Sequence, residues 1–238
     1  MLADENVIGL SAGTLEPGLH RPRTWITELL DFIAVQLPIW RDRADRRAVT
    51  SETELTSQLC GHLNGVARKS PGWDALQFRV EEPDERQSGR RIDLAAAPAG
   101  EIIWIEGQRY SDFDPLLPIE CKRLPTPLGR NRDKREYLRV ARGSTGGIQR
   151  FKAGLHGAAH EQGAMIAYIQ AGEIGTWSTR IDRWIRALDR ARVANWRTND
   201  RLQLSRHDPA LKLALLSSTH DRAEGLQPIT LTHLWIEV

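Results

Sequence analysis

An acid and a lysine two residues apart, Glu120 and Lys122, lie in the apolar segment Leu-Pro-Ile-Glu-Cys-Lys-Arg-Leu at 117–124. In an extended strand, side chains alternate between the two faces, so Glu120 and Lys122 would share one face while Ile119 and Cys121 point to the other. A metal ion held by such a carboxylate, with a lysine beside it to orient or help deprotonate water, is one way to hydrolyse a phosphodiester. Other segments must supply the remaining ligands.

Asp93 is a second acid that could serve the same site. It lies in the middle of a predicted strand at 90–97, where aspartate is disfavoured by propensity. Ile92 and Leu94 would share one face of this strand, so Asp93 would point to the other. The structural alternative is a buried Asp93 that pairs with Arg91 or another basic group.

A third acid, Glu52, opens a predicted helix. Ser51 followed three residues later by Glu54 matches a capping box, which marks a helix start. Glu52 precedes Leu55, the first residue of the apolar stripe of this helix, by three positions, so it could face a neighbouring sheet. The alternative is an acid that only interacts favourably with the helix dipole. Glu54 is a substitute for Glu52 in either role.

Hydrophobic periodicity predicts the elements that must position these side chains. The helix that begins at Ser51 is expected to end near Asn64, and Pro38 is expected to end or kink an earlier helix. The expected helices are 22–39, 51–64, 147–160 and 174–193. The expected strands are 73–81, 90–97, 101–105, 116–124, 163–171, 213–218 and 229–238.

The composition sets broad limits on the class of protein. The 238 residues suffice for one well-packed domain, and the net charge of +2 neither demands nor excludes a nucleic-acid partner. Two cysteines without zinc spacing or a disulfide framework fit a reducing compartment. The chain has neither a signal-peptide pattern nor a stretch of eighteen apolar residues. We therefore expect a soluble, cytoplasmic protein with no membrane partner.

Positive charge concentrates between residues 123 and 152, where nine basic and two acidic residues give a net charge of +7 and leave about −5 for the rest. This asymmetry is typical of a phosphate-contacting surface, although a solvated pair of basic helices would give the same count. Residues expected to contact nucleic acid are Arg91, Arg123, Arg130, Arg132, Lys134, Arg135, Arg139, Arg142, Arg150 and Lys152. The mixed-charge segment 41–47 favours a solvated helix face over a polyanion contact.

The order of these features resembles the PD-(D/E)XK nuclease superfamily, which has the restriction-endonuclease-like fold. The resemblance rests on Glu52 in a helix, Asp93 in Arg-Arg-Ile-Asp-Leu-Ala, and Glu120-Cys121-Lys122 in a further strand, followed by a helix and a buried strand. Gln149, in Gly-Gly-Ile-Gln-Arg-Phe, is similar to a polar helix residue that many members place beside the site. The resemblance covers residues 50–171. It departs from the simplest pattern in lacking a proline before Asp93 and in leaving room for an extra hairpin before Glu120.

The resemblance implies an α/β fold with a mixed central β-sheet flanked by helices. A leader and helical extension at 1–49 would precede a nuclease-like domain at 50–238 that ends in C-terminal strands. The resemblance also implies a Mg²⁺-dependent DNA endonuclease, with Mn²⁺ as the alternative ion. Asp93, Glu120 and the backbone carbonyl of Cys121 would bind the metal, and Glu52 would hold a metal-bound water or a second ion. Lys122 would orient water or stabilise charge.

Gln149 and Arg150 would position the scissile phosphate, although Gln149 could equally cap a local backbone group. DNA is the expected partner, RNA is left open, and cutting of both strands would favour a homodimer. One alternative is a nucleic-acid-binding protein that does not cleave. Another is a partner-activated effector subunit of a multi-protein defence system, because members of this fold are often found in bacterial antiviral defence. The tryptophans of the C-terminal third could supply an interface, but such residues are more often core; they are Trp177, Trp184, Trp196 and Trp235.

Overall fold

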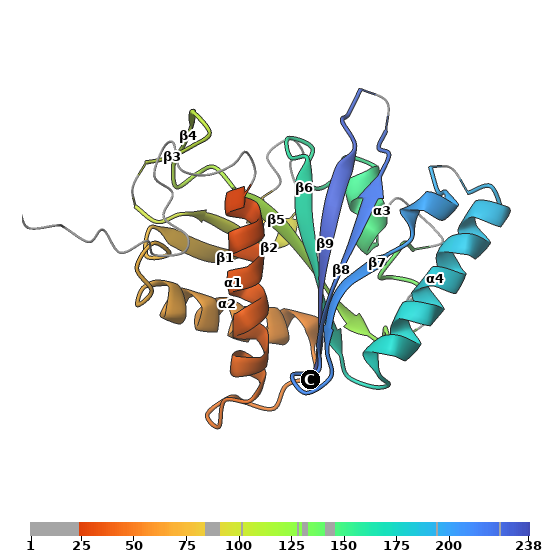
Figure 1. Cartoon of the computed structure of the whole chain (residues 1–238), viewed down its shortest axis with the longest axis horizontal. Coiled ribbons are helices and arrows are strands. Elements are labelled where there is room, and N and C mark those ends of the chain that lie inside the picture. The colour runs from red at the N-terminus through yellow and green to blue at the C-terminus, as the bar shows by residue number, and fades with distance from the viewer. Residues whose placement is uncertain are drawn as a thin grey trace, which may run out of the picture.

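The computed structural model describes residues 24–83, 91–100, 102–127, 129, 133–140, 146–193, 195–223 and 225–238. Its centre is a mixed seven-stranded sheet with the strand order β1-β2-β5-β6-β9-β8-β7, which gives the chain an α/β fold (Figure 1). The strands are β1 (Leu76–Pro83), β2 (Arg91–Pro98), β5 (Leu117–Leu124), β6 (Gln162–Ile169), β7 (Gln203–Asp208), β8 (Leu213–His220) and β9 (Ile229–Glu237). The pairs β5–β6 and β6–β9 are parallel, and the other neighbouring pairs are antiparallel.

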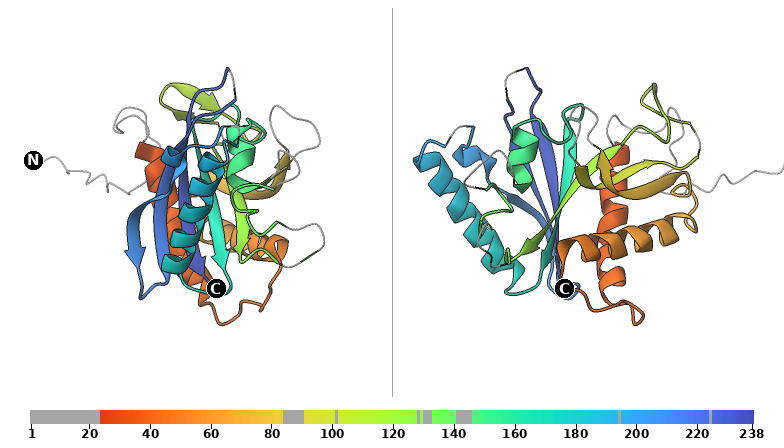
Figure 2. Two further views of the ribbon diagram at one scale, coloured as in Figure 1. Left: turned by 90° about the vertical axis from the view of Figure 1, so that its right-hand side faces the viewer. Right: turned by 180° about the vertical axis from the view of Figure 1, so that it is seen from behind.

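Helices cover both faces of this sheet, as the views from the side and from behind show (Figure 2). One apolar cluster joins α1 (Thr24–Arg41) and α2 (Glu52–Ala67) to one face of the sheet. A second cluster joins α3 (Gly147–Lys152) and α4 (Ile174–Arg190) to the other face. Neighbouring residues of a strand point to opposite faces of the sheet, so each strand can contribute to both clusters. In β6, Ile166 belongs to the first cluster and Met165 to the second. The segment 24–41 therefore shares its core with the rest of the chain.

The start of α2 confirms the expected cap, but its end differs from the expectation. The Ser51 side chain accepts a hydrogen bond from the backbone N–H of Glu54 at 3.2 Å. The helix continues through Asn64 to Ala67. The Asn64 side chain exchanges two 2.8 Å hydrogen bonds with the backbone of Phe78, so it ties α2 to β1 and does not end the helix.

Three other elements differ from the sequence prediction. The helix after residue 146 ends at Lys152, because Gly154 and Gly157 adopt positive φ values of 66° and 58° that interrupt it. The expected strand 101–105 lies outside the main sheet, where β3 (Ile103–Ile105) pairs with β4 (Gln108–Tyr110) as the extra hairpin. Strand β7 was not predicted, because its residues are mostly exposed and lack apolar alternation. Pro38 lies inside α1, which continues to Arg41.

The C-terminal tryptophans are mainly core residues, as the simpler reading predicted. Trp177, Trp196 and Trp235 are buried in the second apolar cluster, and Trp184 packs partly buried against it. None of the helices in the described ranges is long and apolar enough to cross a membrane.

Candidate active site

The candidate site lies where β2 and β5 stop pairing. Their ladder joins only Leu94, Ala95 and Ala96 to residues 117–119. At the next position along β2, the hydrogen bond to β5 is made by a side chain and not by the backbone. Oδ2 of Asp93 accepts a 2.8 Å hydrogen bond from the N–H of Cys121. The interrupted ladder therefore leaves space for side chains between two central strands.

The Lys122 ammonium is the centre of this site. Its Nζ lies 2.9 Å from Glu52 Oε1, 3.1 Å from Asp93 Oδ2 and 2.9 Å from Glu120 Oε1. It also donates a 2.6 Å hydrogen bond to the carbonyl oxygen of Cys121. The side chain of Lys122 is 5% exposed and that of Glu120 is fully buried. Residues from α2, β2 and β5, expected to act together, thus surround one cation; we name Glu52, Asp93, Glu120 and Lys122 the acid–lysine cluster.

Local structure explains why Glu52 and not Glu54 joins this cluster. Glu52 is the first residue of α2, and its Oε2 accepts a 3.1 Å hydrogen bond from the backbone N–H of Arg123. The guanidinium of Arg123 donates to the carbonyl of Thr50, which also fastens the start of α2 to β5. The carboxylate of Glu54 instead accepts a hydrogen bond from the Ser51 hydroxyl.

Two basic side chains from the α3 region hold Glu120 from the other side. Nη1 of Arg150 donates a 2.7 Å hydrogen bond to Glu120 Oε1. Nδ1 of His156 lies 3.0 Å from Glu120 Oε2, close enough for an ion pair but without the alignment of a hydrogen bond. His156 was missed by sequence analysis because it follows no metal-ligand spacing. Its approach to Glu120 depends on how the chain turns after α3.

Burial and the opposing charges shift the pKa values of the cluster. Burial alone would raise the pKa of Glu120, but Lys122, His156 and Arg150 outweigh it and lower that pKa to about 2. Burial and the charge of Glu120 raise the pKa of Asp93 to about 6. Burial would lower the pKa of Lys122, but the three carboxylates raise it well above its usual value. Lys122 is therefore an ammonium at neutral pH, and Asp93 is the acid whose charge changes most readily.

The donor atoms of the cluster fit a hard divalent cation in chemistry. Carboxylate and carbonyl oxygens are the ligands that Mg²⁺ and Mn²⁺ prefer. As the side chains stand, however, the position between the carboxylates is taken by the Lys122 ammonium. No group of three or more His, Cys, Asp or Glu in the described part of the chain is arranged to hold a metal ion. Burial raises the pKa of the Cys121 thiol, which leaves its backbone carbonyl as its contribution to this site.

A pocket of about 210 Å³ adjoins the cluster between α2 and the first two strands. Glu52 and Asp93 line it, together with Thr56 and Val80 among others. Glu120 does not line this pocket, because it is fully buried beneath. An incoming group would therefore meet Glu52 and Asp93 first.

The structure places the remaining residues expected at the site in different surroundings. Gln149 Oε1 accepts a 2.7 Å hydrogen bond from Trp196 Nε1, so the amide is engaged with the second apolar cluster. The expectation that Lys152 contacts nucleic acid is wrong, because its buried ammonium lies 2.5 Å from Asp200 Oδ1. Arg123 and Arg150 lie at the acid–lysine cluster.

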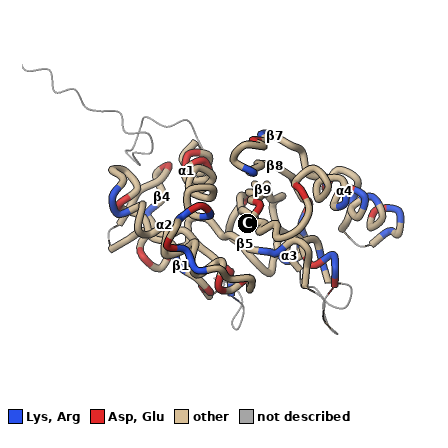
Figure 3. Tube along the Cα trace, turned by 90° about the horizontal axis from the view of Figure 1, so that it is seen from below, with Lys and Arg blue, Asp and Glu red and all other residues tan. Residues whose placement is uncertain are grey.

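The other basic residues lie outside the cluster's contacts. Arg91 is exposed and lies 3.7 Å from Glu81. Lys134 is exposed, and Arg135 and Arg139 are partly buried. The expected contacts that lie outside the described residues are Arg130, Arg132 and Arg142. Figure 3 shows further basic residues along α4, none of which was among the expected nucleic-acid contacts.

A second buried polar group, absent from the sequence prediction, links β8 and β9 to the α3 side. Asp200 Oδ1 is 2.6 Å from His220 Nδ1, and Ser218 Oγ is 2.7 Å from both His220 Nε2 and His233 Nε2. His233 Nδ1 is 2.7 Å from the hydroxyl of Tyr137. All five residues are buried, so this polar chain connects core elements and does not expose Ser218 as a nucleophile.

Comparison of the chain with protein-family models, curated proteins and solved structures gives no match.

Proposed function

We propose that this protein is a Mg²⁺-dependent nuclease that hydrolyses phosphodiester bonds of DNA at the acid–lysine cluster. The single observation that carries the proposal is the convergence of Glu52, Asp93 and Glu120 on Lys122 within 3.1 Å, although the four residues come from three elements. If the acid-x-lysine triplet had arisen by chance, we would not expect one further acid from a neighbouring strand and another from a helix start to contact its lysine.

The order of elements also supports a restriction-endonuclease-like core. Glu52 opens α2, Asp93 lies in β2, and Glu120 and Lys122 lie in β5, which is followed by α3 and the parallel strand β6. This is the order on which the sequence resemblance rests. The departure noted in the sequence corresponds to the β3–β4 hairpin, which lies between Asp93 and Glu120 without interrupting the main sheet.

In the proposed mechanism, Asp93, Glu120 and the Cys121 carbonyl would hold Mg²⁺, with Glu52 beside them. The bound ion would supply Lewis-acid stabilisation of charge on the phosphoryl group. Lys122 remains protonated because its pKa is raised, so its role is to stabilise developing negative charge and orient water, not to accept a proton. Arg150 and His156 fix the orientation of Glu120 through its two oxygens.

Cleavage of supercoiled plasmid in Mg²⁺ or Mn²⁺ tests this proposal. The parent is compared with Asp93→Ala, Glu120→Ala and Lys122→Ala, after each variant is shown to be folded by its melting curve. We expect the parent to nick or linearise the plasmid and each variant to lose activity by orders of magnitude, because these residues would form the reaction centre. Equal cutting by all four proteins would reject the site.

A second candidate function is nucleic-acid binding without cleavage. It is favoured by the Lys122 ammonium, which pairs with all three carboxylates and occupies the position between them. A gel-shift assay run beside the plasmid assay separates the two functions. Binding of DNA by the parent, with no nicking under any divalent metal, would support the binding protein and contradict the nuclease.

A further inference from the structure

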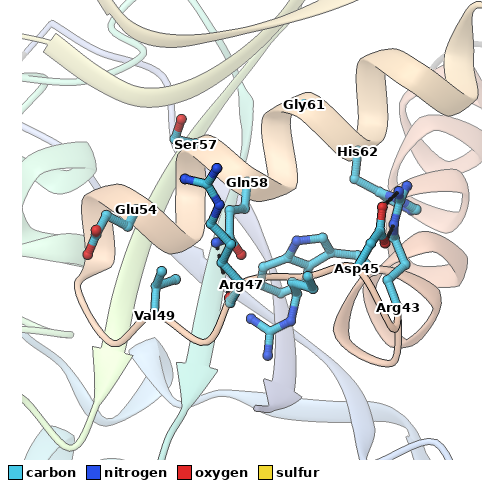
Figure 4. Close-up of a pocket in the computed structure, with 11 residues that line it drawn as sticks. Arg43, Asp45, Arg47, Val49, Glu54, Ser57, Gln58, Gly61 and His62 are labelled. Atoms are coloured by element: carbon cyan, nitrogen blue, oxygen red, sulfur yellow. Dashed lines mark hydrogen bonds and ion pairs between the residues drawn. The ribbon is translucent and has the colours of Figure 1, made fainter.

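A larger cavity, of about 490 Å³, lies on the outer side of α2, between this helix and the segment that connects it to α1 (Figure 4). Its volume falls within the roughly 300–1,000 Å³ of typical small-molecule sites. Ser57 lines both this cavity and the pocket at Glu52 and Asp93, so the first half of α2 separates the two. We name it the arginine cavity, because Arg43, Arg46 and Arg47 line it.

Two of the three arginines have no acid partner among the residues that the structure describes. Arg43 forms a two-pronged ion pair with Asp45, at 2.5 and 2.8 Å (Figure 4). The guanidinium of Arg46 lies 4.9 Å from the centre of the Trp40 ring, and its Nε donates to the carbonyl of Arg41 at 3.2 Å. The guanidinium of Arg47 forms no hydrogen bond or ion pair with any residue that the structure describes. Asp45 and Glu54 also line the cavity, so its three guanidinium groups exceed its carboxylates by one positive charge, and this excess could attract an anion.

Three residues that line the cavity each carry a buried polar atom without a hydrogen-bond partner among the described residues. They are Nε1 of Trp40, Nη1 of Arg46 and Oε1 of Gln58. Trp40 is only 1% exposed, and the Gln58 amide nitrogen already donates to the carbonyl of Arg47 at 3.1 Å. Buried polar atoms are nearly always paired, so three beside one cavity need an explanation. Two are N–H donors and one is an acceptor.

We propose that the arginine cavity binds the phosphate of a nucleotide unit. Guanidinium groups match phosphate oxygens in geometry and charge, and the oxygens would also accept from the Trp40 N–H. A sugar hydroxyl or a base amino group would donate to Gln58 Oε1. The unit is either a free nucleotide or part of a nucleic-acid strand. This binding does not depend on the proposed nuclease activity, because the cavity shares none of the cluster's four residues.

Isothermal titration calorimetry tests the proposal with the full-length protein and three probes: AMP, adenosine, and a single-stranded 12-mer of DNA without terminal phosphates. The parent is compared with Arg46→Gln and Arg47→Gln. Arg68→Gln is the matched control, because Arg68 is exposed at the other end of α2 and its replacement changes the net charge equally. Glu120→Ala separates this cavity from the acid–lysine cluster.

We expect Arg46→Gln and Arg47→Gln to weaken binding at least tenfold, while Arg68→Gln and Glu120→Ala bind AMP as the parent does. Binding of AMP with weaker binding of adenosine assigns the cavity to free nucleotides. Binding of the 12-mer alone assigns it to a strand. Arg47 is exposed, so Arg47→Gln keeps the fold and carries the test even where Arg46→Gln does not fold.

Absence of binding of both phosphate-containing probes to the parent would overturn the proposal. Unchanged affinity in Arg47→Gln, or an equal loss in Arg68→Gln, would also overturn it. Loss of binding in Glu120→Ala with retention in Arg47→Gln would move the ligand to the other site and overturn it as well.

Discussion

At the scale of single residues, the charge of Lys122 allows three carboxylates to occupy one small space. Glu120 is fully buried, and Glu52 and Asp93 retain only 22% and 27% exposure of their side chains. Without a central cation, these acids would repel each other in a region of low dielectric. Lys122 is therefore expected to stabilise the fold as well as the proposed transition state.

Removal of this charge is expected to destabilise the protein. Lys122→Met should lower the free energy of unfolding at pH 7.5 by about 3–5 kcal/mol, the usual cost of breaking a buried pair. Mg²⁺ should restore part of the loss, because the carboxylates are then free to share another cation. Urea denaturation with and without Mg²⁺ measures both effects. Lys134→Met, at an exposed position, is the control, and a loss no larger than that of the control would contradict the account.

Glu52 and Glu54, two acids in the first turn of α2, allow a catalytic role to be distinguished from a role in helix capping. Glu52→Gln should lower the rate of plasmid nicking by about tenfold or more, because Glu52 contacts Lys122 directly. Glu54→Gln should leave the rate nearly unchanged, because the Glu54 carboxylate contacts Ser51 at the helix start. Initial nicking rates at saturating Mg²⁺ measure the difference. The reverse order of effects would exchange the roles of the two residues.

At the scale of elements, a tight approach between α3 and its neighbours positions Arg150. A Cβ atom added to Gly147, the first residue of α3, would lie 2.5 Å from the carbonyl oxygen of Tyr137 and 2.4 Å from Met165. Gly146 precedes it with a φ of 111° and lies close to the backbone of Arg139. These glycines allow close packing and a left-handed turn, not phosphate binding by backbone amides.

Gly147→Ala is therefore expected to lower the free energy of unfolding by about 1–3 kcal/mol through overpacking. Gly65→Ala is the control inside α2, where an added Cβ meets nothing within 4 Å. This control should instead raise the free energy of unfolding by about 0.5–1 kcal/mol, because alanine is the better helix former. Thermal or urea denaturation measures both. An unchanged free energy of unfolding in Gly147→Ala would contradict overpacking and mean that the backbone around Tyr137 can shift to accommodate the added methyl group.

Features that depend on local sequence were predictable, and features that depend on tertiary contacts were not. The Ser51 cap and strand β5 follow from a few adjacent residues, and the structure has both. The contact of His156 with Glu120 and the burial of Lys152 against Asp200 join segments whose approach no local pattern encodes. Strand alternation predicted that Glu120 and Lys122 share a face, and the family resemblance added the expectation that Glu52 and Asp93 join them.

At the scale of the whole molecule, the buried polar chain through Asp200, His220, Ser218, His233 and Tyr137 holds the second core together. Its hydrogen bonds can all be satisfied in one direction: Tyr137 donates to His233, His233 to Ser218, Ser218 to His220, and His220 to Asp200. This direction requires both histidines to be neutral. Burial lowers the pKa of His220, and lowers that of His233 well below its usual value.

The free energy of unfolding is therefore expected to fall as the pH decreases from about 6.5 to 5. In this range the unfolded state binds protons at both histidines, and the folded state binds fewer because both pKa values are lowered. Asp93 opposes the trend by one proton, because its pKa of about 6 in the folded state exceeds the unfolded value. His62, whose pKa burial also lowers, adds to the fall, so the net difference is on the order of one to two protons, or about 1.4–2.8 kcal/mol per pH unit.

Urea denaturation at several pH values measures this slope. His233→Gln is the diagnostic variant, because its amide can still accept from Tyr137 and donate to Ser218 but cannot titrate. Its slope should be clearly shallower than that of the parent. A parent whose free energy of unfolding stays constant or rises toward pH 5, or an unchanged slope in His233→Gln, would contradict this role of the polar chain.

The most direct test of the central claim is the rate of Mg²⁺-dependent plasmid nicking by the parent and by Asp93→Asn. This substitution keeps the shape of a partly exposed side chain and removes only its charge. The account predicts that the parent nicks DNA and that Asp93→Asn is slower by about a hundredfold or more. The melting temperature of Asp93→Asn at neutral pH should be no lower than that of the parent, because the raised pKa of Asp93 means that the folded site disfavours its charge. Equal rates in the two proteins, or no nicking by the parent in either Mg²⁺ or Mn²⁺, would contradict it.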